Sequence, residues 1–166
     1  MTDFLIVSGT LQSHQNAVQH LVRPWEVEHL ITRSAPPPAW VVTHRKPFAE
    51  QVAEWLKNQF AGDQLSYQSD PSAFDVWYAP GTTLRRRAGD CEDFTLLAVS
   101  LLLAGGIPAW VAVGTVPGGG HAWVEGKDEQ GGFLIEATSG DLFRYRPNNY
   151  QLLWHVEPDF SLLRAA

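Results

Sequence analysis

The chain has 166 residues with a formal net charge of −6 and an isoelectric point near 5.4, and 45% of its residues are hydrophobic while 18% are charged. This composition is typical of a single globular domain with a buried core, and acidic residues outnumber basic ones, so we expect neither a disordered chain nor a nucleic-acid partner. Its apolar stretches are too short for a membrane span or a secretory signal, and its single cysteine is easiest to keep reduced in the cytosol, so we expect a cytoplasmic protein without a membrane partner.

The first 45 residues carry the weakest pattern, and we interpret residues 1–45 as an N-terminal extension. Phe4 to Val7 fits an edge strand, whereas Pro24 interrupts the mixed apolar pattern of residues 17–30 and argues against one continuous helix. A proline-rich connector then leads to residues 40–42, which fit a short strand or a strap across the surface.

A clear helical pattern begins after Pro47. Apolar residues recur at spacings of three and four from Phe48 to Phe60, and Gly62 stops the run, which predicts an amphipathic helix. Residues 63–88 are polar and rich in turn residues, so we interpret them as a long connection. Its aromatic side chains either pack it against the core or line a substrate groove.

Cys91, the only cysteine, stands at the start of the most apolar helical pattern in the chain, residues 94–104. Asp90 suits the N-cap of this helix and Asp93 suits the third helical position, as in a capping box. A helix with almost no polar face is predicted to be buried. The positive end of its dipole, roughly +0.5 of a charge, favours a thiolate, although the neighbouring acids oppose this by raising the pKa of the cysteine. Cys91 is therefore a candidate nucleophile.

Three strand patterns follow the helix: residues 107–114, 121–125 and 133–137. The last two flank a polar, turn-like segment and predict a β-hairpin. If Trp123 pairs with Leu134, His121 lies directly opposite Glu136 on the same face of the hairpin.

In this hairpin Glu136 would orient the ring of His121 so that its other nitrogen faces Cys91. A thiol, an imidazole and an acid placed in this way could form a nucleophilic site.

The segments around Cys91, His121 and Glu136, in their order along the chain, resemble the transglutaminase-like superfamily, and they are most similar to its bacterial cysteine proteinases. The resemblance spans about residues 74–140, which we take as the catalytic core of a single domain, 1–166. The segments that carry it are Trp77-Tyr78-Ala79-Pro80, Gly89-Asp90-Cys91-Glu92-Asp93-Phe94, Gly106-Ile107-Pro108-Ala109, His121-Ala122-Trp123-Val124-Glu125 and Glu136. The resemblance implies an α+β, papain-like fold in which a buried Cys-bearing helix packs on an antiparallel β-sheet.

The resemblance also implies catalytic roles. Cys91 would be the nucleophile, His121 the general base and then the general acid, and Glu136 the acid that orients His121. The superfamily most often has Asp at this third position, so Asp141 is an alternative to Glu136.

A calcium site is a further possibility that the resemblance raises. Some of the bacterial proteinases hold calcium with acids that flank the cysteine, which here correspond to Asp90 and Glu92. Calcium takes roughly six to eight oxygen ligands, so two adjacent acids are too few alone. We therefore expect no metal cofactor and interpret both acids as serving the helix. The other histidines lack the spacing of a zinc site.

An oxyanion site and a substrate groove complete the predicted machinery. The backbone N–H of Cys91 is a natural oxyanion donor at a helix start. The candidates for a second donor are Trp77, Trp55 and Gln64. The aromatic candidates for the groove are Tyr78, Trp110 and Trp123.

The function that these residues indicate is a cysteine hydrolase that cleaves a peptide or side-chain amide bond of a peptide or protein substrate, through an acyl-enzyme on Cys91. One alternative is an acyl transferase, in which an amine replaces water as the acceptor. The other is a non-enzymatic module that binds a peptide or a partner subunit through its aromatic surface, Trp40, Trp77, Tyr78 and Trp110. The sequence does not predict the oligomeric state.

Overall fold

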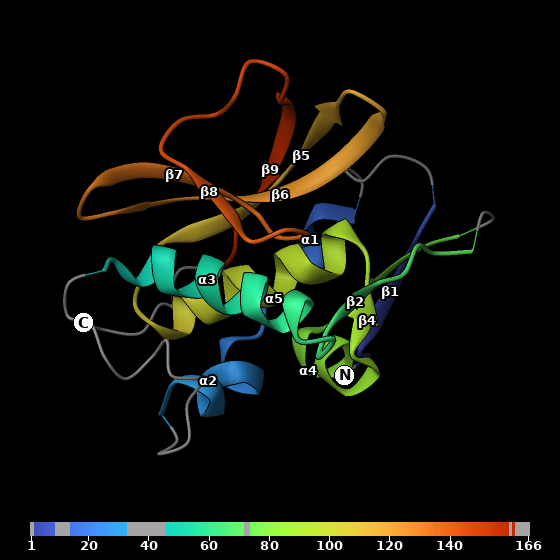
Figure 1. The fold of residues 1–166 in the computed structure, drawn as a ribbon. Helices are drawn as coiled ribbons and strands as arrows, with labels where there is room; N and C mark the ends of the chain where they lie inside the picture. Colours follow the sequence, from blue (N-terminus) through green and yellow to red (C-terminus); the bar gives the residue numbers. More distant parts are fainter. Residues whose placement is uncertain (1, 9–13, 33–45, 72–73, 160, 162–166) are drawn as a thin grey trace.

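A computed structural model describes residues 2–8, 14–32, 46–71, 74–159 and 161 of the chain. Its main sheet has five antiparallel strands in the order β8-β7-β6-β5-β9 (Figure 1). These strands are β5 (Ala109–Val116), β6 (Gly119–Asp128), β7 (Gly131–Glu136), β8 (Asp141–Phe143) and β9 (Gln151–Val156). An antiparallel sheet with helices beneath it is the predicted α+β architecture.

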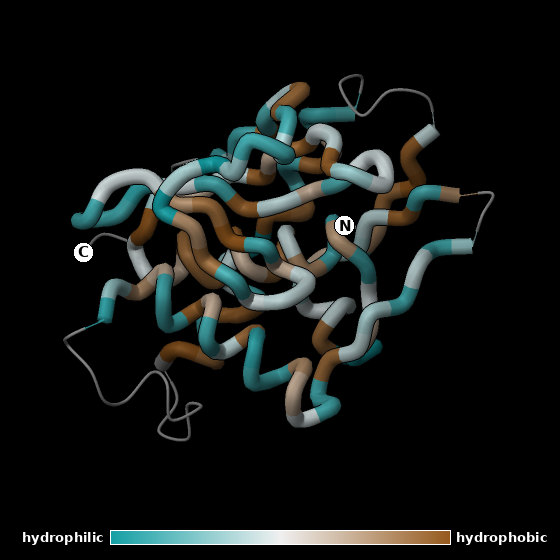
Figure 2. The backbone as a smooth tube through the Cα atoms, turned by 45° about the horizontal axis from the view of Figure 1, so that its top comes forward, coloured by the Kyte–Doolittle hydropathy of each residue, from teal (hydrophilic) through white to brown (hydrophobic). Residues whose placement is uncertain are grey.

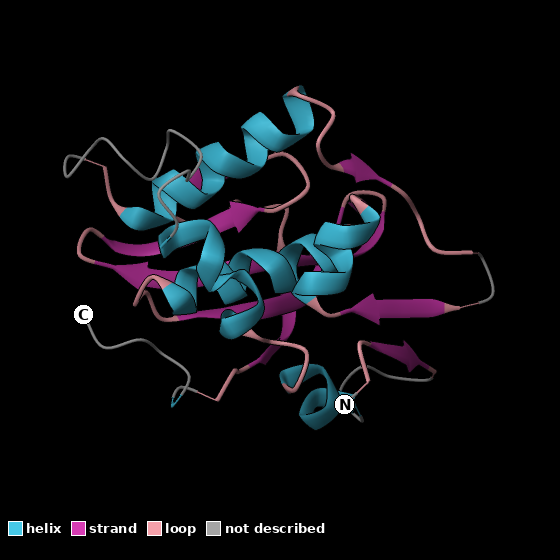
Figure 3. Cartoon of the chain, turned by 90° about the horizontal axis from the view of Figure 1, so that it is seen from below, coloured by secondary structure: helices cyan, strands magenta, loops and turns pink. Residues whose placement is uncertain are grey.

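The helices gather on one side of this sheet, as the view from below shows (Figure 3). They are α1 (Gln15–Gln19), α2 (Pro24–Thr32), α3 (Phe48–Ala61), α4 (Pro80–Arg86) and α5 (Cys91–Ala104). The central helix is α5, which contacts β5 and β6 as well as α2, α3 and α4. The predicted helix after Pro47 is confirmed as α3, and Gly62 is its C-cap.

Burial on all sides distinguishes α5 from the other helices. Every residue from Glu92 to Ala104 is buried, as the apolar pattern predicted. The hydroxyl groups inside this apolar environment are satisfied, because Thr95 donates to the Cys91 carbonyl at 2.6 Å and Ser100 accepts the backbone N–H of Arg23 at 3.0 Å. Hydrophobic stretches likewise concentrate in the middle of the molecule (Figure 2).

The two faces of the sheet differ in what they pack against. Val111, Val124 and Ile135 point into the main core shared with the helices. The alternate positions point to the opposite face, where a smaller cluster contains Ala112, Trp123, Leu134, Phe143, Tyr150 and Leu152.

The pairing of β6 with β7 differs from the prediction by two residues. Glu125 pairs with Leu134, whereas the sequence analysis gave Trp123 this partner. The strands extend further than predicted, so that a shorter turn joins them. Because side chains alternate with a period of two, a shift of two residues keeps His121 and Glu136 on one face but makes them diagonal neighbours.

The segment predicted as a long connection, residues 63–88, contains short regular elements instead. They are β2 (Ser66–Tyr67), β3 (Asp75–Tyr78), α4 and β4 (Ala88–Gly89). β2 pairs with β4 in parallel, and β3 pairs with β1 (Phe4–Val7), which is the predicted edge strand. Elements this short have too few residues to show a periodic pattern in the sequence.

The described part of the N-terminal extension packs into the core. Residues 17–30 do not form one continuous helix, as predicted: α1 ends at Gln19, Pro24 begins α2, and α2 lies against α5. The buried Arg23 forms ion pairs with Asp3 at 3.0 Å and Glu26 at 2.9 Å. Glu26 also accepts the backbone N–H of Gly81 at 2.7 Å, which ties this segment to α4.

Residues 40–42, predicted as a strand or strap, lie outside the described residues. None of the helices in the described ranges is long and apolar enough to cross a membrane.

The close approach of β5 and β9 at Gly114 gives a prediction for stability. A Cβ atom there would lie 2.0 Å from the carbonyl oxygen of Gln151, whereas one at Gly120 would meet open space. Overpacking costs about 1–3 kcal/mol, so Gly114→Ala should lower the melting temperature by roughly 3–10 °C. Gly120→Ala is the matched control and should change it little. Equal melting temperatures in a thermal scan would contradict this account of the β5–β9 contact.

Candidate active site

The start of α5 is held in place by its cap. The Asp93 carboxylate accepts the backbone N–H of Asp90 at 3.1 Å, and it also accepts the backbone N–H of Tyr78 in β3 at 2.8 Å. Burial raises the pKa of Asp93 to about 7. The predicted capping box is therefore present, and it also joins β3 to the helix that carries Cys91.

The sulfur of Cys91 contacts one hydrogen-bond acceptor and one hydrogen-bond donor. Its thiol donates to the Glu92 carboxyl at 3.1 Å, and the backbone N–H of Ala122 in β6 donates to the sulfur. Burial first, and then the charge of Glu92, raise the pKa of Cys91 well above its usual value. The thiolate that the helix dipole was expected to favour is therefore not the form favoured in this structure, because desolvation and the neighbouring acids outweigh the dipole.

His121 and Glu136 are in contact, as the sequence analysis expected. The Nε2 atom of His121 lies 2.7 Å from Oε2 of Glu136. Burial alone would raise the pKa of Glu136, but hydrogen bonds from His121, Tyr150 and Thr138 outweigh it and lower this pKa. Because Nε2 faces the acid, Nδ1 is the ring nitrogen that remains for Cys91.

The alternative acid, Asp141, is paired with Glu136 between β7 and β8, but its side chain is directed away from His121 toward α3. Its side chain is exposed and forms an ion pair with Lys57 on α3 at 3.0 Å. Of the two acids that the sequence offered, the structure thus brings Glu136 and not Asp141 to His121.

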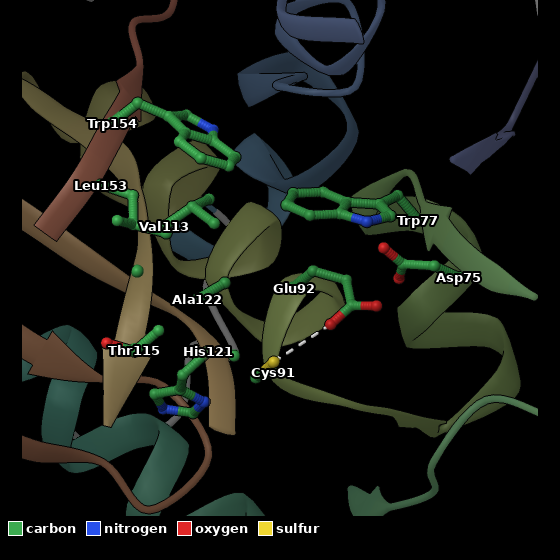
Figure 4. A pocket seen from close by; sticks show the side chains of 12 residues that line it. Asp75, Trp77, Cys91, Glu92, Val113, Thr115, His121, Ala122, Leu153 and Trp154 are labelled. Atoms are coloured by element: carbon green, nitrogen blue, oxygen red, sulfur yellow. Dashed lines mark hydrogen bonds between the residues drawn. The ribbon is translucent and has the colours of Figure 1, made fainter. Parts of the chain in front are cut away.

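A cavity of about 470 Å³ contains both Cys91 and His121. Figure 4 shows the His121 ring beside Cys91, with Trp77 and Trp154 on opposite walls. Within the described residues, the thiol is hydrogen-bonded to Glu92 rather than to His121. The walls are mostly apolar and include Trp77 on β3, Val113 on β5, Ala122 on β6, and Leu153 and Trp154 on β9.

Of the three candidate oxyanion donors, Trp77 alone lines this cavity. Its side chain is 3% exposed, and its indole N–H is buried without a hydrogen-bond partner in the described part of the chain. Trp55 is buried in the core on α3, and Gln64 is exposed and accepts a hydrogen bond from Arg87. The positions of Trp55 and Gln64 therefore do not support the role suggested for them.

The predicted groove residues Tyr78, Trp110 and Trp123 do not line the cavity either. Tyr78 has the guanidinium of Arg86 over its ring at 3.9 Å, and the Trp110 ring packs against that of His155. Trp123 is fully buried on the far face of the sheet.

Val113, Leu153 and Trp154 form the apolar walls in their place. The two β9 residues were not among the predicted site residues, because no element was predicted after residue 141. The strand propensity of residues 151–156 was the available signal.

Three carboxylates converge beside Cys91. Asp70, Asp90 and Glu92 each place an oxygen within 4.8 Å of the others. One oxygen of Asp90, Oδ1, is buried and has no hydrogen-bond partner among the described residues. Burial first, then a hydrogen bond with Asp75 and the charge of Asp90, raise the pKa of Glu92 to about 11. Asp70 was not predicted as a site residue, because Asp70-Pro71 is an ordinary turn signal.

Comparisons with known proteins identify the family and the fold of this chain. The family model of the transglutaminase-like superfamily matches residues 38–135, which is more than half of the chain. The centrosomal protein of 76 kDa from Mus musculus is 41% identical over 77 residues, and so is its Homo sapiens counterpart. The matched segment is 45% of this chain but only 12% of the length of these relatives.

Solved structures with the same fold come from bacteria. Calcium-bound LapG of Legionella pneumophila superposes with a TM-score of 0.53 at 17% identity, over 90% of this chain and 77% of LapG. A candidate cysteine protease of Cytophaga hutchinsonii gives a TM-score of 0.51 at 18% identity, over 90% of this chain and 45% of that chain. These likenesses show the fold, and the family match shows the membership: the chain belongs to the transglutaminase-like superfamily.

Proposed function

We propose that this protein is a cysteine hydrolase that cleaves a peptide or side-chain amide bond through an acyl-enzyme on Cys91. The observation that carries the proposal is the shared cavity of Cys91 and His121, with Glu136 bound to the far nitrogen of the imidazole at 2.7 Å. A nucleophile, a base and an orienting acid in this order are the parts that nucleophilic catalysis requires. The fold shared with a candidate cysteine protease supports the same conclusion.

In the proposed reaction, Nδ1 of His121 takes the thiol proton of Cys91, and the sulfur attacks the carbonyl carbon of the substrate. The electron pair of the C=O bond moves to the oxygen, where the backbone N–H of Cys91 and the indole N–H of Trp77 would stabilise it. His121 then gives its proton to the leaving amine as the C–N bond breaks. Water attacks the thioester in the same way, which releases the acid and restores the thiol.

The hydrogen bond from Cys91 to Glu92 must break before this reaction begins. The sequence favoured helix capping alone for the acids around Cys91, but the unpartnered Asp90 oxygen favours a divalent cation held by Asp70, Asp90 and Glu92. Carboxylate oxygens suit calcium, and LapG has been solved with calcium bound. A bound cation would supply positive charge that offsets these acids beside the thiol. Backbone oxygens or water would complete its coordination.

The walls of the cavity favour an apolar substrate side chain or acyl group. Val113, Leu153 and Trp154 form one wall and Trp77 the other, and Leu153 is 58% exposed at the cavity although it is a large apolar residue. Covering this surface would stabilise a complex by about 25 cal/mol for each Å² of apolar area removed from water.

The reaction is tested with p-nitrophenyl acetate, which needs no knowledge of the natural substrate. Intact-mass spectrometry should find one acetyl group on Cys91, and released p-nitrophenolate should show turnover. Cys91→Ser should abolish both, and His121→Ala should lower the rate by about a hundredfold or more because the base is lost. Glu136→Gln should also lower it, whereas the exposed Asp141→Asn serves as the control and should leave it unchanged.

Other outcomes of this test point to other functions. Capture of the acetyl group by an added primary amine in preference to water would indicate an acyl transferase. No acetylation of Cys91 with or without calcium would overturn the enzyme and leave the binding module.

The apolar wall is tested by ester chain length. The p-nitrophenyl hexanoate ester has four more methylene groups than the acetate, each worth up to about 0.8 kcal/mol when buried, so acylation should favour hexanoate by about tenfold or more. Leu153→Asp should reduce this ratio, while Phe4→Asp, an exposed apolar residue on β1, should preserve it. A ratio near one in the unmodified protein would contradict an apolar subsite.

The raised pKa of Glu92 predicts how stability depends on pH. Its folded value of about 11 lies above its ordinary value of 4.5, so the folded state retains a proton that the unfolded chain releases. The resulting stabilisation is complete below about pH 4.5 and is lost as the pH rises toward about 11. The melting temperature of the metal-free protein should therefore fall between about pH 5 and pH 9, and Glu92→Gln should flatten this slope.

Two additions complete the test of the acidic cluster. Glu129→Gln, in the exposed turn between β6 and β7, is the control and should keep the slope. Millimolar calcium should raise the melting temperature near pH 8 in the unmodified protein but not in Glu92→Gln or Asp90→Asn. An absence of calcium binding in calorimetry would overturn the cation site, and Asp90 and Glu92 would then serve only the start of the helix.

A further inference from the structure

Tyr150 reaches the acid of the candidate site from a part of the chain that the proposed reaction does not use. It stands directly before β9, and its hydroxyl donates to Oε2 of Glu136 at 2.8 Å. This is the same oxygen that lies 2.7 Å from Nε2 of His121. The other oxygen of Glu136 accepts the Thr138 hydroxyl at 2.8 Å and its backbone N–H at 3.3 Å. Both oxygens of this carboxylate are therefore held by donors.

The aromatic ring of Tyr150 is also fixed in place. It meets the Trp123 ring edge to face, with centroids 5.2 Å apart, and it meets the His121 ring at 6.3 Å. Its backbone N–H donates to the Pro147 carbonyl at 2.9 Å, which fixes the chain just before the strand. The phenol thus contacts the imidazole, the carboxylate bound to it and the indole beneath both.

We propose that Tyr150 is a positioning residue that holds Glu136 in the orientation His121 needs for catalysis, and this proposal rests on the proposed function. A glutamate side chain has one more rotatable bond than an aspartate, so its carboxylate needs more contacts to stay in one orientation. Tyr150 supplies such a contact on the oxygen that meets His121. The proton on Nε2 of His121 then stays in the hydrogen bond to Glu136, and Nδ1 remains free to accept the thiol proton.

The protonation of Tyr150 agrees with this role. Burial first, and then the hydrogen bond to Glu136, raise the pKa of Tyr150 above its usual value. Its hydroxyl therefore remains a donor over the pH range in which a cysteine hydrolase works.

Tyr150→Phe removes the hydroxyl and keeps the ring, so it separates positioning from packing. We expect turnover of p-nitrophenyl acetate to fall about tenfold, mainly in kcat, with KM nearly unchanged. In ¹⁵N NMR spectra, His121 should change from one dominant tautomer to a mixture, which loss of packing alone would not produce. Tyr145→Phe is the matched control, because Tyr145 lies in the same connection between β8 and β9 but is 71% exposed.

A double variant distinguishes coupling through the acid from a general structural effect. In a Glu136→Gln background, Tyr150→Phe should lower turnover by less than twofold, since both changes disrupt the same contact. Full additivity of the two losses would overturn the proposal. So would wild-type turnover and an unchanged tautomer of His121 in Tyr150→Phe.

The proposed function can fail separately from this inference. If Cys91 is never acetylated, the reaction is wrong, yet the NMR measurement still tests whether Tyr150 orients His121. If Cys91 is acetylated and Glu136→Gln slows turnover while Tyr150→Phe does not, the hydrolase stands and the positioning role of Tyr150 is rejected.

Discussion

The burial of α5 constrains the rest of the molecule. From Glu92 onward this helix is buried against the sheet and the other helices, and its first turn, Cys91 and Glu92, lines the cavity. The same turn is tied to β3, because Asp93 accepts the backbone N–H of Tyr78. Cys91 and the strand that carries Trp77 are therefore fixed relative to each other. A shift of the helix would expose apolar side chains, each worth about 1.5–3 kcal/mol when fully buried.

In this fixed position, opposing electrostatic effects act on the pKa of Cys91. A helix N-terminus stabilises an adjacent negative charge by about 0.3–1 kcal/mol, and by about 2 kcal/mol in favourable geometry. Burial and the acids beside the sulfur act in the opposite direction and prevail, since the pKa of Cys91 is raised. Glu92 connects the thiol to the acidic cluster, because it accepts the hydrogen bond of the thiol and lies beside Asp70 and Asp90. If the charge of that cluster were neutralised, the pKa of the Cys91 thiol would fall.

The imidazole and the acid of the candidate site come from the sheet, on the face opposite to the one that packs against α5. His121 and Glu136 share that face with Trp123, and Tyr150 covers them. The resemblance seen in the sequence led us to expect the shorter Asp where this chain has Glu136. The three donor side chains around Glu136, from His121, Tyr150 and Thr138, offset the freedom of the longer side chain. The connection between β8 and β9 thereby becomes part of the site's support.

The sequence by itself determined the features that depend on neighbouring residues: the apolar periodicity of α5, its capping acids around Cys91, and the strand that carries His121. It also placed Glu136 on the face of His121 despite a register error of two residues, because alternation along a strand preserves the face. Only the tertiary structure decided that Asp70 joins the acids beside Cys91, that β9 walls the cavity and that Tyr150 holds Glu136. Those contacts join segments far apart in the chain, and their formation depends on packing and strand pairing that no local pattern records.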